Sequence, residues 1–190
     1  MSDLPSLGKY NGDFVHPHLA VGGCPHPGDV PAFVAAGIRG IIDGRSCMLK
    51  EHVIYIASLP NSIHWEILGT WDGIYPNETW TERDPGRPSA MTTVCPVYAA
   101  FMVERMARVV RDHWPVLIHC GGGIGRSGNL AAVAYAALEE VTVDEALERM
   151  RVYRPVLGGW HPGRYPGTDP ARLVELAAAV LEGTAPKEGR

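Results

Sequence analysis

The stretch VLIHCGGGIGRSGNLAA, residues 116–132, most constrains what this chain can fold into. A short apolar run ends at His119 and Cys120, glycine dominates the next positions, and a run of helix-forming residues completes the stretch. We interpret the apolar run as a buried strand and the last part as a helix. Residues 121–126 are then the turn that joins them.

Strand-like and helix-like segments alternate along the rest of the chain. Residues 13–23 and 38–44 favour strands on either side of a helix, and two further apolar segments, 53–59 and 62–71, are each compatible with a strand. Helices are predicted over residues 26–37, 97–113, 127–140, 143–153 and 170–183. This alternation predicts an α/β fold with a mainly parallel central sheet flanked by helices.

The length and composition are those of one ordinary globular domain. The chain has 190 residues, with 46% hydrophobic and 20% charged residues, and we interpret residues 1–190 as a single domain with a polar tail over 184–190. The net charge of −4 and the scattered Lys and Arg disfavour a nucleic-acid partner. The apolar runs are too short to span a membrane, and the N-terminus has no secretory pattern, so we predict a cytoplasmic protein.

The turn after Cys120 has the composition of an anion site. The glycines at 121, 122, 123 and 125 permit unusual backbone dihedrals and a close approach of N–H groups to a ligand. The start of the following helix adds its positive dipole, and Arg126 offers two parallel donors that suit a phosphate group. The same charges are expected to lower the pKa of the Cys120 thiol, which makes it a nucleophile directed at the bound group.

The sequence HCGGGIGRSG resembles the HCxxGxxRSG motif of the cysteine-dependent protein tyrosine and dual-specificity phosphatases at every fixed position. The resemblance implies that Cys120 attacks phosphorus to form a thiophosphate intermediate and that Arg126 binds the equatorial oxygens. It implies that Ser127 hydrogen-bonds the departing thiolate and that His119 supports the loop from behind. The phosphate-binding backbone would be that of Gly121, Gly122, Gly123, Ile124 and Gly125.

The resemblance extends weakly beyond the loop, over residues 14–182. LAVGGCPHPGDVPAFVAAGIRGIIDGRS looks like the first strand–helix–strand unit of compact dual-specificity and bacterial phosphatases, and RMRVYRP looks like their helix after the motif. No segment resembles the phosphotyrosine-recognition loop of the larger tyrosine-specific enzymes. The resemblance therefore implies a fold like that of the protein tyrosine phosphatases, with a shallow pocket and no cofactor.

The proton donor for the leaving group has two candidates. Asp72, in TWDGIYP, follows directly after the segment 62–71, whereas Asp84, in RDPGRPS, lies a dozen residues further on. We favour Asp72, because a residue that leaves a strand beside the cysteine strand reaches the turn without further folding. Both lie in a long Pro- and Gly-rich segment, residues 72–93. Loops of this length in a compact domain usually have a function.

Two other groups of side chains are candidates for secondary roles. The chain contains no Gln, the residue that positions the hydrolytic water in other members of the family. Trp160, His161 or Arg164, in the last loop, could line the pocket. Four residues of types that bind zinc lie close together in the sequence, at His16, His18, Cys24 and His26. Their spacing matches no metal motif, and we predict no metal site.

Three functions are compatible with the sequence. The first is a phosphatase that acts on phosphoproteins, with phosphotyrosine preferred and phosphoserine or phosphothreonine tolerated. The second is the same chemistry on a small phosphate ester such as a nucleotide or a sugar phosphate. The third is a phosphate-binding pseudophosphatase, disfavoured because Cys120 and Arg126 are both present. The sequence does not determine the oligomeric state, and a monomer suffices.

Overall fold

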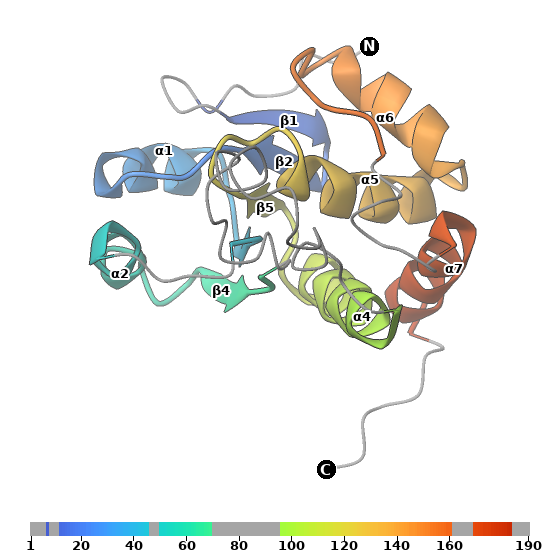
Figure 1. Cartoon of the computed structure of the whole chain (residues 1–190). Coiled ribbons are helices and arrows are strands. Elements are labelled where there is room, and N and C mark those ends of the chain that lie inside the picture. The colour runs from blue at the N-terminus through green and yellow to red at the C-terminus, as the bar shows by residue number, and fades with distance from the viewer. Residues whose placement is uncertain (1–6, 8–11, 46–49, 70–95, 161–168, 184–190) are drawn as a thin grey trace, which may run out of the picture.

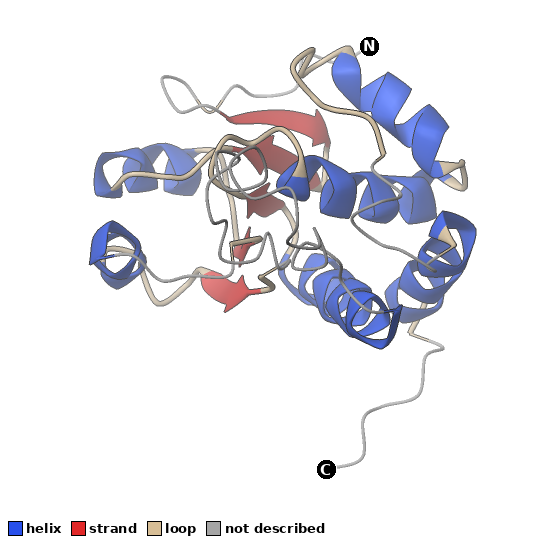
Figure 2. Cartoon of the chain, viewed as in Figure 1, coloured by secondary structure: helices blue, strands red, loops and turns tan. Residues whose placement is uncertain are grey.

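The computed structural model describes residues 7, 12–45, 50–69, 96–160 and 169–183. A five-stranded sheet with the spatial order β1-β2-β5-β3-β4 forms the centre of the molecule (Figure 2). The strands are β1 (Gly12–His16), β2 (Leu19–Gly22), β3 (Gly40–Asp43), β4 (His64–Ile67) and β5 (Val116–His119). The first strand is antiparallel to its neighbour and the other four are parallel, which confirms the predicted α/β class with a mainly parallel sheet.

Helices cover both faces of this sheet (Figure 1). The smaller core contains residues of α1 (Val30–Ala35) and α2 (Lys50–Ala57), and the short 3₁₀ helix η1 (Pro27–Asp29) precedes α1. The larger core contains residues of α4 (Pro96–His113), α5 (Arg126–Glu139), α6 (Val143–Arg151) and α7 (Pro170–Leu181).

Strand residues alternate between the two cores, as the pleat requires. Leu117 and Ile41 pack in the smaller core, whereas Ile118 and Ile42 pack in the larger one. The central strand is therefore apolar on both faces, which is typical of a parallel strand covered by two helical layers.

Two strand predictions need correction. Residues 13–23 contain two strands rather than one, because the chain reverses at residues 17 and 18 to form the β1–β2 hairpin. Residues 53–57 belong to α2 and not to a strand, whereas the segment 62–71 does contain β4. The run VIYIASL places Tyr55 in the smaller core and leaves Ile54 exposed, so these two successive residues lie on different faces of a helix.

Local capping contacts mark several helix ends. Thr142 and Glu145 form a capping box at the start of α6, and Gly37, at φ 76°, follows the end of α1. The side chain of Asp29 does not cap α1. Its carboxylate accepts the backbone N–H of His26 and so caps η1 instead.

Within the described ranges, no helix is long and apolar enough to cross a membrane. The predicted polar tail, residues 184–190, lies outside the described residues.

Candidate active site

The carboxyl ends of three parallel strands meet where the cysteine loop begins. Gly22 of β2, His119 of β5 and Asp43 of β3 lie in one row across the sheet. We refer to residues 120–126, which leave the central strand and lead into α5, as the cradle. This edge of a parallel sheet is where α/β proteins bind ligands, because the loops from neighbouring strands converge there.

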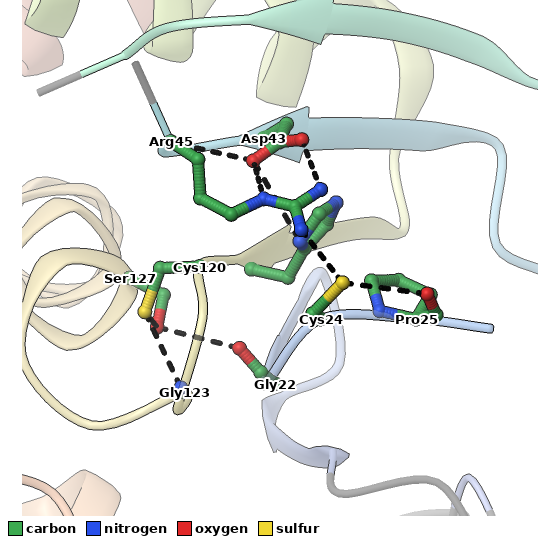
Figure 3. Close-up of polar contacts among 9 residues, drawn as sticks. Gly22, Cys24, Pro25, Asp43, Arg45, Cys120, Gly123 and Ser127 are labelled. Atoms are coloured by element: carbon green, nitrogen blue, oxygen red, sulfur yellow. Dashed lines mark hydrogen bonds and ion pairs between the residues drawn. The ribbon is translucent and has the colours of Figure 1, made fainter. Parts of the chain in front are cut away.

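The sulfur of Cys120 lies within hydrogen-bond distance of the Ser127 hydroxyl and the Gly123 backbone N–H (Figure 3). Cys120 is only 2% exposed, its Sγ is 3.3 Å from the Ser127 hydroxyl, and it accepts the backbone N–H of Gly123 at 3.3 Å. Burial raises the pKa of the thiol, but the Ser127 hydroxyl and the backbone N–H groups of Ser127 and Gly123, together with the Arg126 charge, outweigh it. The pKa of Cys120 is therefore lowered, as the sequence predicted, and the thiolate is favoured.

Arg126 is the first residue of α5, and its side chain reaches back over the cradle. One of its terminal nitrogens lies 3.6 Å from the point where a Cβ on Gly121 would sit. No side chain caps the start of α5, where Gly125 occupies the N-cap position. The guanidinium therefore lies close to Gly121, and its charge acts on the Cys120 thiol from the start of α5, an arrangement that can hold an oxyanion.

Gly123 allows the cradle to close against the neighbouring strand. Its φ is +68°, and a Cβ there would overlap the backbone of Gly22 and Gly23. Two backbone hydrogen bonds join the same segments, from Cys120 N–H to the Gly22 carbonyl at 3.2 Å and from Cys24 N–H to the Gly121 carbonyl at 2.9 Å. The pair Gly22–Gly23 thus braces the cradle, a role that the sequence analysis missed although VGG ends a predicted strand.

Arg154 also braces the cradle at Gly123, and the sequence analysis missed this residue too. It follows α6, is 2% exposed, and donates from Nε to the Gly123 carbonyl at 2.9 Å. Its Nη1 donates to the carboxylate of Asp13 in β1 at 2.8 Å. In the sequence, Arg154 stands out only as part of RMRVYRP, where it lies between a predicted helix and a proline.

His119 lies behind the cradle, as the resemblance implied. Its side chain is fully buried, with Nδ1 3.8 Å from the Asp43 carboxylate and its ring edge-on to that of Tyr55. Burial raises the pKa of Asp43, but hydrogen bonds from Arg45 and the nearby charges of His119 and Arg45 outweigh it, so the carboxylate stays ionised.

Asp72, Asp84, His161 and Arg164 lie outside the described residues. Trp160 packs against the larger core and borders a hollow of about 370 Å³ between the starts of α6 and α7.

The four possible zinc ligands near the N-terminus do not gather. His16 and His18 lie at the β1–β2 turn, where their rings contact each other and His16 hydrogen-bonds Glu139 at 3.0 Å. Cys24 and His26 follow the opposite end of β2. Across the described ranges, no three His, Cys, Asp or Glu side chains come together in a way that could hold a metal ion.

Replacing Gly123 with Ala should weaken oxyanion binding, because the methyl group meets the Gly22–Gly23 backbone and requires an unfavourable φ. We expect the affinity for inorganic phosphate to fall on the order of a hundredfold, measured by calorimetry. Gly122→Ala is the matched control, because its methyl group would find only Ile124 Cδ1, at 3.9 Å. Equal losses in both variants would contradict the bracing role of Gly123.

Neither protein-family models nor curated proteins match this sequence. Solved structures do match. TpbA from P. aeruginosa, as a cysteine-to-serine variant in complex with pTyr, is 16% identical with a TM-score of 0.59 and covers 90% of this chain and 91% of its own. A mouse putative dual specificity phosphatase complexed with zinc tungstate is 15% identical with a TM-score of 0.56, and the match covers 96% of both chains.

Human DUSP28 is 14% identical with a TM-score of 0.55, and the match covers 90% of this chain and 95% of that one. These three similarities extend over nearly the whole of each chain, although fewer than one residue in five is identical. The chain therefore has the fold of the dual-specificity and protein tyrosine phosphatases.

Proposed function

We propose that this protein is a phosphomonoester hydrolase in which the Cys120 thiolate is the nucleophile. The observation that carries the proposal is the position of the Cys120 sulfur among donors from Gly123 and Ser127, beside Arg126. These groups stabilise negative charge on the sulfur in the free protein. Backbone donors and a guanidinium in such a place also stabilise the charge that develops on a transferring phosphoryl group.

In the first step, the Cys120 sulfur attacks phosphorus, a sulfur–phosphorus bond forms and the ester oxygen–phosphorus bond breaks. Arg126 binds two of the equatorial oxygens, and the backbone of residues 121–125 binds the third. The leaving oxygen needs a proton, and we assign its donor to Asp72 in preference to Asp84, on the sequence argument above.

In the second step, water attacks the phosphocysteine, inorganic phosphate forms and the electron pair returns to sulfur. Ser127 supports this step, because its hydroxyl lies 3.3 Å from the Cys120 sulfur and can donate to the thiolate as it departs. The same hydroxyl is 3.5 Å from the Gly22 carbonyl, which gives the proton a second acceptor while the sulfur is bonded to phosphorus.

The favoured substrates are phosphoproteins, with phosphotyrosine first. Two of the arginines near the cradle are paired with carboxylates, Arg45 with Asp43 and Arg154 with Asp13, and the loop itself carries no Lys. This charge pattern suits a single phosphoryl group better than a polyanionic head group. The similarity to the TpbA structure with pTyr supports the same choice.

Two alternatives remain. The same chemistry on a small phosphate ester is the first, since the fold accommodates more than one substrate class. A phosphate-binding pseudophosphatase is the second, and the retained Cys120 and Arg126 disfavour it.

Replacing Cys120 with Ser should eliminate hydrolysis of an aryl phosphate while binding of inorganic phosphate persists, because the cradle donors are unchanged. Release of phosphate and trapping of a phosphoenzyme by acid quench measure the two steps. Cys24→Ser is the matched control, because it removes an exposed thiol next to the cradle and should retain turnover. Equal turnover of wild type and Cys120→Ser would refute the mechanism.

The general acid can be identified from the leaving group. Replacing the true acid with Asn should lower kcat strongly for alkyl phosphates and much less for aryl phosphates with good leaving groups, because only poor leaving groups need the proton. We expect this pattern for Asp72→Asn and not for Asp84→Asn. The reverse result would identify Asp84 as the general acid. If neither variant changed kcat in this way, both assignments would be wrong.

A panel of phosphopeptides and phosphorylated metabolites, assayed side by side, separates the two substrate classes. Phosphoprotein activity predicts that kcat/KM for phosphotyrosine peptides exceeds that for every nucleotide or sugar phosphate. A higher kcat/KM for a metabolite would make the small-molecule alternative the correct one.

A further inference from the structure

A cluster of polar side chains lies behind the cradle, on the sheet face opposite to the nucleophile. Side chains two residues apart along an extended chain point to the same face. His119 and Asp43 follow Leu117 and Ile41, which pack in the smaller core, whereas Cys120 follows His119 and points to the other face. Figure 3 shows the Cys120 and Ser127 side chains on one side of the cradle and Cys24 and Arg45 on the other.

The centre of the cluster is the ion pair of Asp43 and Arg45. Both side chains are about 5% exposed, and the Asp43 carboxylate accepts the backbone N–H, Nε and Nη2 of Arg45. Charged side chains are seldom buried so completely unless they are paired. The two side chains therefore exchange their hydration for a bidentate ion pair in which each charge balances the other.

The pair contacts the segments that lead into and flank the cradle. Asp43 Oδ1 is 3.8 Å from His119 Nδ1, one residue before the nucleophile. Arg45 Nη1 is 2.6 Å from the sulfur of Cys24, whose backbone N–H holds the Gly121 carbonyl. The pair thus reaches both β5 and the loop after β2 from the end of β3.

The other ionisable groups facing the pair come from three further elements. Tyr55 of α2 is buried, its hydroxyl makes no hydrogen bond to the described residues, and burial followed by the Asp43 charge raises its pKa. Asp29, at the end of η1, contributes a smaller electrostatic effect at the same hydroxyl. Burial also raises the pKa of Cys24, which favours the neutral thiol. A neutral thiol adds no charge to the cluster. On the far side, Arg126 acts on Cys120 directly.

We propose that Asp43 and Arg45 are a positioning pair for the nucleophile, which hold His119 and the Cys24 segment in place and keep the charge behind Cys120 balanced. The inference rests on the proposed function of Cys120. Removing either member of the pair changes the charge behind Cys120 by one unit, in a region of low dielectric. The two single substitutions should therefore act on the Cys120 thiolate in opposite directions, and the double substitution should cancel them.

The test measures alkylation of Cys120 by iodoacetamide as a function of pH. The reagent is uncharged, so its rate reports the thiolate and not anion binding, and peptide mass spectrometry separates Cys120 from the other three cysteines. Below the titration midpoint, Arg45→Gln should slow alkylation about three- to tenfold, because the Asp43 carboxylate disfavours the thiolate. Asp43→Asn should accelerate it by about the same factor, and the double variant should return to within about twofold of wild type.

Conservative and remote variants separate positioning from stability. Gln keeps an N–H₂ donor for Asp43 and so favours folding of the variant, and Arg45→Lys keeps the charge and should leave the alkylation profile in place. The control is the pair of Arg105 in α4 and Glu66 in β4, which are 2.7 Å apart. Arg105→Gln should lower stability in thermal unfolding without changing Cys120 alkylation.

The outcomes are distinguishable from failure of the proposed function. If wild type hydrolyses aryl phosphates but both single variants leave the alkylation profile unchanged, or shift it in the same direction, the pair has no positioning role. If wild type shows no turnover and no phosphoenzyme, the proposed function fails, whatever the alkylation data show. If Arg45→Gln and Asp43→Asn both fail to fold, Arg45→Lys becomes the test. The inference would then be overturned if the Cys120 alkylation profile of Arg45→Lys were shifted from that of wild type as far as the profile of the unfolded chain is.

Discussion

The close contact between Gly123 and the Gly22–Gly23 backbone is the constraint on which the rest of the site depends. A Cβ on residue 123 would overlap the backbone of Gly22 and Gly23, so the cradle can approach the end of β2 this closely only with glycine at position 123. Backbone bonds from Cys120 to Gly22 and from Cys24 to Gly121 then fix the loop at the edge of the sheet. With the loop fixed in this way, its remaining N–H groups and the start of α5 are directed to the space above the Cys120 sulfur.

The buried charges around the cradle are arranged in pairs. Arg154 is paired with Asp13 and also holds the Gly123 carbonyl, and Arg45 is paired with Asp43 behind His119. Each guanidinium thereby supports the backbone without leaving an unbalanced charge in the protein interior, where such a charge is costly. Arg126 differs in its position, since it begins α5 and extends over Gly121, and its charge helps to lower the pKa of Cys120. Arg45 and Arg154 are thus each paired with a carboxylate, whereas Arg126 lies beside Gly121 at the start of α5.

The fold class and the centre of the site were predictable from the sequence because local patterns determine them. The apolar run before Cys120, the glycines after it and the helix-forming residues after Arg126 each have a short-range physical meaning, and the structure has β5, the cradle and α5 at those positions. The capping box at Thr142 was predictable for the same reason. The errors arose where local pattern is ambiguous: VIYIASL is rich in β-branched residues, yet it forms a helix because Tyr55 packs in the smaller core.

The sequence by itself determined the strand–turn–helix unit around residues 119–127, because an apolar run, a turn of glycines and a run of helix-forming residues are local patterns. Only the tertiary structure decided what supports it. Asp13, Gly22, Asp43 and Arg154 come from β1, β2, β3 and the turn after α6, and the sheet order that brings them to one edge places β5 between β2 and β3. That order depends on tertiary packing, because the smaller core on one face of β5 contains residues of α1 and α2, which are distant from β5 in the sequence, and no local spacing encodes it.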